Sequence, residues 1–470
     1  MVKSKLDHRE EKMSTPVESP QKWVRLDRPF PLPGYVKEAL QKLDESGHIA
    51  YLVGGSVRDF LLGKELKDHD IATSAPPDLL CKLFPMAIEV GKEFGVIKVP
   101  TGGSPPLLEI ATFRKDLEYS DHRRPEGVVF SGPLEDASRR DFTVNALYYD
   151  PKTNRILDSV GGMDDLKNKV IRAIGQPSVR FREDALRLLR AVRLKVRLEF
   201  QLDPETAQAI QARAKLISKV SAERIRDELT LMWTGPRAAQ ALALLSELAL
   251  LDVILPEVEA LKGVVQISAA HPYDDVWEHL LKMLEFFERQ NPIRTATASW
   301  AAVLHEVGKP VVSKLSQGKN FNGHEIEGAK MAERIAERFK MSRNEVQRVS
   351  ALVADHLKLK DVFQMRESTL QRLLREDHFE ELLALHRADA CAFDGNLAYY
   401  EFCASRLNQL KMNPHLLPPK LLDGRDLIQM GFSPGPLFSE ILNVVEDLTL
   451  EKTLKTKDEA LEYVLKTYVN

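Results

Sequence analysis

Two aspartates separated by a single residue, Asp68 and Asp70, are the side chains whose types and spacing most directly predict chemistry in this sequence. On a β-strand, residues two apart point to one face about 7 Å apart along the chain, so both carboxylates could hold the same Mg²⁺ ions. Two such ions can promote nucleotidyl transfer by activating a hydroxyl and neutralising a triphosphate. An isolated Asp-x-Asp is more often a pair of solvated loop acids, so the prediction depends on the neighbouring segments.

The segment before the acid pair, residues 49–63, is an apolar run, two glycines and a short helical pattern, which predicts a strand, a turn and a helix. Gly54 and Gly55 would let the backbone approach a triphosphate, and Arg58 would add a fixed positive charge. The alternative is an ordinary connection in which Arg58 pairs with Asp59. Because the acid pair follows within fifteen residues, phosphate binding by Gly55 and Arg58 is favoured.

Two further segments could add groups to this site. In the sequence 139–141, Arg-Arg-Asp, Arg140 offers a rigid fork to phosphate or ribose oxygens, although a capped, salt-bridged helix start is the alternative. Glu109 begins an alternating strand pattern and could reach the face that carries the acid pair. A third metal ligand is conceivable there, but a structural or edge acid is the favoured interpretation.

A helical pattern over residues 183–193 predicts how a base could be chosen. Cytosine and adenine both present an amino donor beside a ring-nitrogen acceptor, whereas uracil and guanine reverse that pattern. Asp184 could accept from the amino group while Arg187, one helical turn away, donates to the ring nitrogen. Arg190 and Arg193 would fan around the helix toward triphosphate or primer. The alternative is a solvated helix whose arginines pair with neighbouring acids.

Together these segments resemble the class II tRNA nucleotidyltransferase family, which comprises CCA-adding enzymes and bacterial poly(A) polymerases. The matching segments cover roughly the first half of the chain in the family's order: 54–59 with 68–70, 139–141, 158–166 and 183–193. The resemblance implies an α+β fold, with a polymerase-β-like nucleotidyltransferase head built on a small mixed sheet and an all-α neck, body and tail. It also implies that C, C and A are added to the 3′ end of tRNA from CTP and ATP without a nucleic-acid template.

The pattern of elements predicts how this plan is distributed along the chain. Strand signals give way to helical periodicity after about residue 175, and prolines mark later breaks, including the stretch 414–419. The predicted segments are a disordered extension (1–22), the head (23–175), a helical neck and body for template and RNA (176–270), a helical HD-like domain (271–412) and a helical tail (413–470). By resemblance, the tail would touch the tRNA elbow.

The second half carries a separate set of possible metal ligands, which resembles the HD phosphohydrolase domain of some CCA-adding enzymes. The set is His279, His305, Glu306, His324, His356 and Asp389. Imidazoles and carboxylates suit Mn²⁺, Fe²⁺, Ni²⁺ or Mg²⁺. Glu306, however, stands where the His-Asp dyad has aspartate, and its extra methylene would displace the carboxylate. A structural remnant is therefore favoured over a metal site, and hydrolysis is disfavoured further.

Composition agrees with an ordinary intracellular globular protein. The 470 residues allow two to four domains, and the net charge of −3 gives no overall positive field, so RNA binding would need local basic surface such as residues 180–197. The three cysteines form neither a disulfide framework nor a zinc pattern. No apolar run is long enough to span a membrane, so a cytoplasmic protein is expected. Nothing in the sequence predicts an oligomeric state.

Several alternatives share parts of these motifs. A poly(A) polymerase, or a partner enzyme that adds only CC or only A, would carry every head motif. The polar stretch 116–125 resembles the loop that switches the family from C to A addition, and residues 91–96 with the HD-like half resemble full CCA-adding members. An ordinary surface loop is the alternative for 116–125. A metal-dependent phosphohydrolase with a nucleotide-binding head is a further alternative, which Glu306 disfavours.

Overall fold

The computed structural model describes residues 22–66, 68–89, 95–103, 107–117, 127–266, 274–291, 294–315, 320–413 and 420–468. Several sequence-based expectations therefore fall outside the described residues: the extension 1–21, most of the segment 91–96, the loop after residue 117 and the linker 414–419. The backbone contacts group the chain into two compact units. The first comprises residues 1–221 and 248–253, and the second comprises 222–247 and 254–470.

The first unit is built on the mixed sheet that the sequence predicted. Its eight strands follow the order β1-β10-β9-β2-β3-β6-β5-β4, and β3 with β6 is the parallel pair among otherwise antiparallel neighbours. The bounds are β1 (Lys22–Arg25), β2 (Ala50–Val53), β3 (Asp70–Thr73), β4 (Ile88–Glu89), β5 (Val96–Pro100), β6 (Leu107–Thr112), β9 (Leu147–Asp150) and β10 (Arg155–Asp158). Two short pairs lie beside it, β7 (Arg114–Asp116) with β8 (Val128–Phe130) and β11 (Val170–Ile171) with β12 (Gln201–Leu202).

The core of this unit lies where the central strands bury alternate apolar residues. Val53 of β2, Ala72 of β3, Tyr148 of β9 and Leu157 of β10 pack together with Phe113, and each is at most 3% exposed. Residues of one parity along a strand share a face, so these side chains form one apolar layer. This layer holds β2 and β3 in register, and β2 ends and β3 begins at the edge where the predicted acid pair lies.

The helices of the first unit follow the turn and cap signals. They are α1 (Gly34–Glu45), α2 (Gly55–Leu61), α3 (Pro77–Leu83), α4 (Pro133–Ser138), α5 (Gly162–Asn168), α6 (Pro177–Glu183), α7 (Arg187–Leu198) and α8 (Pro204–Arg213), with 3₁₀ turns η2 (Thr143–Asn145) and η3 (Ala214–Lys219). Proline occupies the first helical position of α6 and α8, where no N–H is needed. In α8 the carboxylate of Asp203 also caps the N–H of Thr206.

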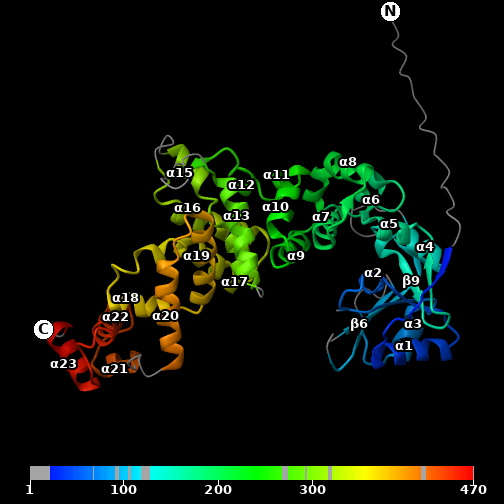
Figure 1. The fold of residues 1–470 in the computed structure, drawn as a ribbon. Coiled ribbons are helices and arrows are strands. Elements are labelled where there is room, and N and C mark those ends of the chain that lie inside the picture. Colours follow the sequence, from blue (N-terminus) through cyan, green and yellow to red (C-terminus); the bar gives the residue numbers. More distant parts are fainter. Residues whose placement is uncertain are drawn as a thin grey trace, which may run out of the picture. The chain divides into compact units, whose positions relative to one another are not determined.

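The second unit is almost entirely helical, as the sequence predicted, and its helices occupy the green-to-red part of Figure 1. They are α9 (Ala222–Trp233), α10 (Ala238–Glu247), α12 (Pro256–Glu259), α13 (Val276–Gln290), α14 (Ala296–Leu304), α15 (Lys309–Leu315), α16 (His324–Arg338), α17 (Arg343–Asp355), α18 (Glu367–Arg375), α19 (Phe379–Phe393), α20 (Ala398–Met412), α21 (Gly424–Gln429), α22 (Pro436–Leu450) and α23 (Lys457–Tyr468). The short helix α11 (Leu251–Ile254) spans the division between units, the 3₁₀ turn η4 covers Lys358–Asp361, and β13 (Val265–Gln266) pairs with β14 (Asp274–Asp275).

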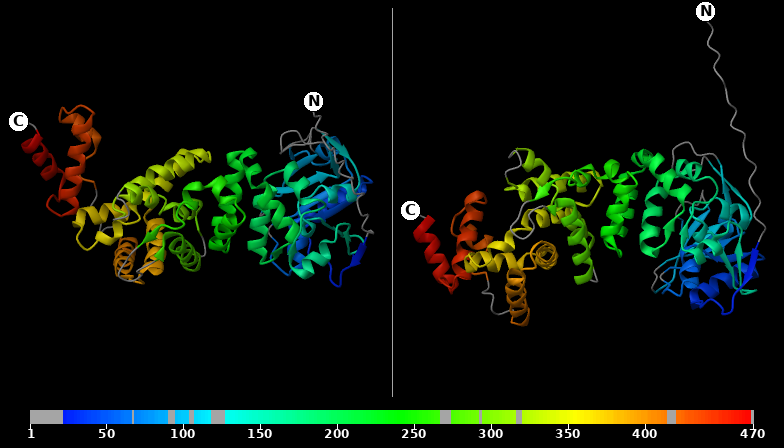
Figure 2. Two further views of the ribbon diagram at one scale, coloured as in Figure 1. Left: turned by 90° about the horizontal axis from the view of Figure 1, so that it is seen from above. Right: turned by 45° about the horizontal axis from the view of Figure 1, so that its top comes forward.

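Two regions of the second unit matter for the functional argument. Helices α13, α14, α16, α17 and α19 enclose a buried polar centre, while α21, α22 and α23 share a separate apolar cluster around Leu427, Ile441 and Val464. Figure 2 shows the red C-terminal helices gathered together in both views. Within the described part of the chain, every helix is too short or too polar to cross a bilayer.

Candidate functional site

The acid pair lies at the start of β3 rather than within it. The expectation that both aspartates lie on a strand is therefore wrong for Asp68, because β3 begins at Asp70. The register explains this, because Val53 at the end of β2 is opposite Asp70. The residue after Val53, Gly54, already turns into α2. Residues before Asp70 thus have no strand to pair with on that side. Burial still alternates, since Asp68 is exposed, His69 is buried and Asp70 is half-buried.

Three carboxylates gather at this edge of the sheet. Glu109 of β6 is directly opposite Asp70 in the parallel pair, so the possible third acid does lie beside the pair. Burial, followed by the negative charges of Glu109 and Asp68, raises the pKa of Asp70 to about 6. Arg140 and Lys98 oppose this shift, and Lys98 Nζ lies 3.8 Å from Glu109 Oε2. A cluster whose own charges resist ionisation fits a divalent cation.

The glycine turn lies directly against this acidic cluster. Gly54 has φ of +81°, and a Cβ placed on it would lie 3.4 Å from Asp70 Oδ2 and 3.8 Å from Arg140 Nη1. A residue with a side chain would therefore be strained in its backbone, and its Cβ would be in van der Waals contact with both groups. Gly55 begins α2 immediately after the turn. The predicted glycine turn, acid and Arg140 are thus brought together.

Arg140 is held next to Asp70 by a buried carboxylate and a phenol. Its Nε donates to Tyr148 Oη at 2.9 Å, and its Nη2 donates to Asp136 Oδ2 at 3.2 Å. Burial by itself would raise the pKa of Asp136, but Arg140 and Arg139 hold it at about 2. Asp136 and Tyr148 were absent from the sequence-based site. Only an apolar strand pattern for Tyr148, and a place three residues before the Arg-Arg-Asp segment for Asp136, could have drawn attention to them.

Arg58 is buried in a chain of hydrogen bonds and is not directed at open solvent. It donates to Asp59 Oδ1 at 2.8 Å, as the alternative interpretation expected, and also to Asn145 Oδ1 at 2.6 Å. Asn145 in turn donates to Asp141 Oδ1 at 3.1 Å, and Arg190 donates to Asp141 Oδ2 at 2.5 Å. This chain ties α2, η2 and α7 to the Arg-Arg-Asp segment. Arg58 and Arg190 therefore hold neighbouring elements of the site in place through their hydrogen bonds.

The two predicted base-reading residues lie on different elements, contrary to the expectation of one continuous helix. Helix α6 ends at Glu183, Asp184 is extended, and α7 begins at Arg187. Asp184 Oδ1 accepts from the N–H of Leu186 at 3.1 Å, so the aspartate side chain stabilises the turn between the two helices. Arg187 donates to Glu183 Oε2 at 2.8 Å and to the carbonyl of Arg139 at 2.7 Å.

The predicted arginines of α7 do spread around the helix. Arg187 is 8% exposed, whereas the Arg190 side chain is 36% exposed and Arg193 is half-buried. Burial would raise the pKa of Asp141, but Arg190 keeps it well below its ordinary value. The structure thus links α7 to the head through the Arg190–Asp141 ion pair and the hydrogen bond from Arg187 to the carbonyl of Arg139.

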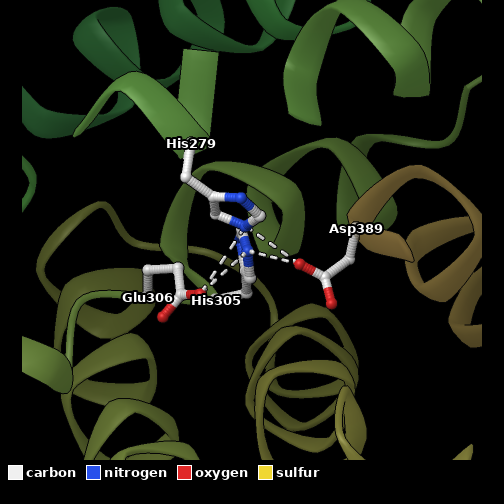
Figure 3. Close-up of side chains that lie close together, drawn as sticks. All are labelled: His279, His305, Glu306 and Asp389. Atoms are coloured by element: carbon white, nitrogen blue, oxygen red, sulfur yellow. Dashed lines mark hydrogen bonds and ion pairs between the residues drawn. The ribbon is translucent and has the colours of Figure 1, made fainter. Parts of the chain in front are cut away.

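The six possible metal ligands of the second unit converge in one buried centre, although 110 residues separate the first from the last. Figure 3 shows His279 from α13, His305 and Glu306 after α14, and Asp389 from α19 pointing toward one another. His279 Nε2 lies 3.0 Å from Asp389 Oδ1 and 3.8 Å from Glu306 Oε1. His324 begins α16, His356 follows α17, and their Nε2 atoms are 3.2 Å apart.

Three of these imidazoles have their tautomer set by the backbone. Nδ1 of His305, His324 and His356 lies 2.9, 2.8 and 2.7 Å from the carbonyl three residues earlier. A carbonyl accepts only from an N–H, so each neutral ring presents an unprotonated Nε2 to the centre. Burial lowers the pKa of all three, that of His356 to about 4. Two lone pairs then face each other between His324 and His356, which is unfavourable without a cation.

Glu306 reaches this centre despite its extra methylene. Its Oε1 lies 3.6 Å from His305 Nε2, and its Oε2 lies 3.5 Å from His324 Nε2. Lys309 Nζ lies 2.6 Å from Oε1, and this charge helps to hold the pKa of Glu306 well below its ordinary value although burial opposes it. Among the described residues, buried Glu306 Oε2 and His305 Nε2 lack a hydrogen-bond partner. The donor set therefore fits a divalent cation, and the Glu306 carboxylate lies among the other donors.

Three protein-family descriptions match successive parts of the chain. They are the poly A polymerase head domain (residues 50–172), the probable RNA and SrmB-binding site of polymerase A (199–262) and the HD domain (276–394). The division into five segments that the sequence suggested stays a prediction.

The similar proteins and solved structures given below are all described as CCA-adding enzymes. A CCA-adding enzyme of Lactobacillus helveticus is 34% identical over 430 residues, which is 91% of this chain and 95% of that protein. One from Geobacillus stearothermophilus is 43% identical over 233 residues, or 49% of this chain and 57% of that protein. The crystal structure of the Bacillus stearothermophilus CCA-adding enzyme with CTP superposes with a TM-score of 0.62 at 29% identity, covering 93% of this chain and 98% of that one. The Thermotoga maritima enzyme with tRNA, at 20% identity and a TM-score of 0.56 over 93% of this chain and 96% of that one, shares the fold.

Proposed function

Since the chain belongs to the CCA-adding enzyme family of nucleotidyltransferases, we propose that it adds C, C and A to the 3′ end of tRNA from CTP and ATP without a nucleic-acid template. The observation that carries this proposal is the position of the acidic cluster of Asp68, Asp70 and Glu109 against the Gly54 turn and Arg140. The CTP bound by the Bacillus stearothermophilus relative supports the nucleotide, and the tRNA bound by the Thermotoga maritima protein suggests the acceptor.

Asp68 and Asp70 would hold two Mg²⁺ ions in this proposal. Bound ions would lower the pKa of the primer 3′-hydroxyl and neutralise the triphosphate and the departing pyrophosphate. The glycine turn would let the phosphates approach the backbone, and Arg140 would contact them beside Asp70. Arg58 would act through Asn145 to hold the start of α2 in place.

The base would be read by Asp184 and Arg187, although they do not share a helix. Asp184 can accept from the amino group of cytosine or adenine while it also accepts from the N–H of Leu186, because a carboxylate has about four lone-pair sites. Arg187 uses three of its N–H groups on Glu183 and the carbonyls of Arg180 and Arg139. Its two other donors would remain for the ring nitrogen of the base. Glu183 thus orients the arginine, and Arg190 with Arg193 would face the phosphates or primer.

The test is incorporation into tRNA that lacks its 3′ end, with each labelled nucleotide supplied singly and together and the products sequenced. We expect C alone to add twice, A to follow only after C, and nothing to continue beyond A. Repeated A would indicate a poly(A) polymerase, and arrest after CC or addition of A alone would indicate a partial enzyme. Asp68→Ala should abolish incorporation without unfolding, because Asp68 is exposed and precedes the strand. Asp184→Arg should shift the preference away from C and A.

A second candidate function, divalent cation binding, is favoured in the HD-like centre by the converging Nε2 lone pairs. We propose that His279, His305, Glu306 and Asp389 hold a divalent cation, with His324 and His356 beside them. Such an ion could supply a metal-bound water for hydrolysis. The ion pair between Lys309 and Glu306 disfavours this hydrolytic activity. The test is Co²⁺ titration of chelated protein followed by visible absorption. His305→Gln should remove the signal, whereas His378→Gln, a histidine of the same unit paired with Asp355, should retain it.

A further inference from the structure

The residue between the two aspartates, His69, points into the head and not toward the acidic cluster. It is 5% exposed, and its Nδ1 lies 2.9 Å from Tyr35 Oη at the start of α1. The rings of Phe30 and Tyr35 approach it edge-on, with centroids 6.2 and 5.8 Å from the imidazole. His69 is therefore anchored to the chain around α1 by one hydrogen bond and two aromatic contacts.

Asp68 has no comparable anchor of its own. The pairing of β2 with β3 stops at Val53 and Asp70, so Asp68 lies beyond the last ladder position. Its exposed carboxylate makes no hydrogen bond or ion pair with any other residue in the part of the chain that the structure describes. Asp70, in contrast, is fixed by strands on both sides. The position of Asp68 relative to Asp70 thus depends on the residue that joins them.

We propose that the Tyr35–His69 hydrogen bond is a positioning contact that sets the spacing of the Asp68 and Asp70 carboxylates for divalent cations. This inference rests on the proposed nucleotidyl transfer, because it assigns a role in the same site. Neither side chain hydrogen-bonds to Asp68 or Asp70 in the described part of the chain. His69 acts through the backbone on either side of its Cα, and Tyr35 acts through His69.

The hydroxyl of Tyr35 can be removed without changing the aromatic packing. Tyr35→Phe leaves the ring beside His69 but deprives the buried Nδ1 of its partner, so the imidazole is no longer held in one orientation. The loss of one such hydrogen bond corresponds to about a three- to tenfold change in an equilibrium. We expect the Mn²⁺ affinity of the acid pair to fall by that factor, and the Mg²⁺ concentration for half-maximal incorporation to rise by it. At saturating Mg²⁺, kcat should stay within about twofold, because the reacting groups are unchanged.

Matched variants separate positioning from general stability. Tyr149→Phe removes another hydroxyl of the same aromatic group, one that accepts from the N–H of Phe30 and donates to Asn154 without touching His69. His69→Asn keeps a polar atom near the place of Nδ1, whereas His69→Phe fills the space without one. Tyr149→Phe and His69→Asn should therefore keep a wild-type metal dependence, and His69→Phe should resemble Tyr35→Phe.

Mn²⁺ binding is measured from the electron paramagnetic resonance signal of the free ion. The part of the bound Mn²⁺ that is lost in Asp68→Ala is assigned to the acid pair. Weaker binding of that component in Tyr35→Phe alone supports the positioning role. An unchanged isotherm in Tyr35→Phe, or an equal loss in Tyr149→Phe, overturns it while leaving wild-type incorporation, and hence the proposed function, intact. Absence of any Asp68-dependent Mn²⁺ binding together with absence of incorporation in the wild type would reject both.

Discussion

Arg187 of α7 donates to the carboxylate of Glu183 at 2.8 Å, across the break between α6 and α7. The acid that orients this arginine is therefore Glu183, while Asp184 accepts from the N–H of Leu186 in the turn between the helices. The two neighbouring acids therefore have separate roles. Glu183 fixes the guanidinium of Arg187, and the Asp184 carboxylate is placed to accept from a base.

Glu183→Gln should reduce the discrimination between CTP and UTP by about tenfold, because the guanidinium loses its charged partner and is held only by carbonyls. The measurement is the ratio of kcat/KM for the two nucleotides. Glu205→Gln, which removes an exposed acid from the first turn of α8, is the control and should leave the ratio unchanged. Equal ratios in Glu183→Gln and wild type would remove Glu183 from base selection.

Gly54→Ala should cost about 1–2 kcal/mol of stability and also abolish nucleotide binding, because the position combines a positive φ with contact to Asp70 and Arg140. Gly63→Ala has a similar φ of +68° but meets nothing within 4 Å. Both variants should therefore lose stability in urea denaturation, Gly54→Ala by more because its ψ of −140° lies outside the left-handed region, while only Gly54→Ala loses CTP binding by calorimetry. Retained CTP affinity in Gly54→Ala would contradict the close approach of the phosphates.

Asn145→Ala should destabilise the head by about 2 kcal/mol, because it leaves the buried guanidinium of Arg58 without one of its two acceptors. Urea denaturation of this variant, of Arg58→Met and of the double variant would form a thermodynamic cycle. The double variant should lose clearly less than the sum of the single losses. Simple additivity would show that the hydrogen bond contributes nothing of its own.

The ion pairs of Asp136 predict acid sensitivity in the head. Its pKa of about 2 in the folded protein lies below its ordinary 3.8, so ionised Asp136 favours the fold above about pH 4. That contribution, about 2 kcal/mol, is lost as the pH falls from about 4 to about 2. Asp136→Asn should therefore flatten the decline of unfolding free energy over this window. Glu65→Gln, an exposed acid, should follow the wild-type curve.

Local patterns in the sequence were sufficient for the architecture and for the identity of the main groups. The strand, glycine turn and helix over residues 49–63 and the later helical periodicity follow from short-range preferences, whereas the mixed sheet was expected only from the family resemblance. Glycine conformational freedom, side-chain alternation and caps act over a few residues, so they can be read from the chain directly.

The tertiary structure decided which of these groups meet. Whether β3 would begin at Asp70, and whether Glu109 would stand beside it, depended on pairing with strands distant in sequence. Arg58 donates a hydrogen bond to Asn145, which is 87 residues away in the sequence, and His279 is hydrogen-bonded to Asp389, which is 110 residues away. Such contacts arise from packing a whole unit, because each pairing must satisfy buried donors and acceptors at once. The sequence by itself determined the chemical groups available to the site, and only the folded chain determined their partners.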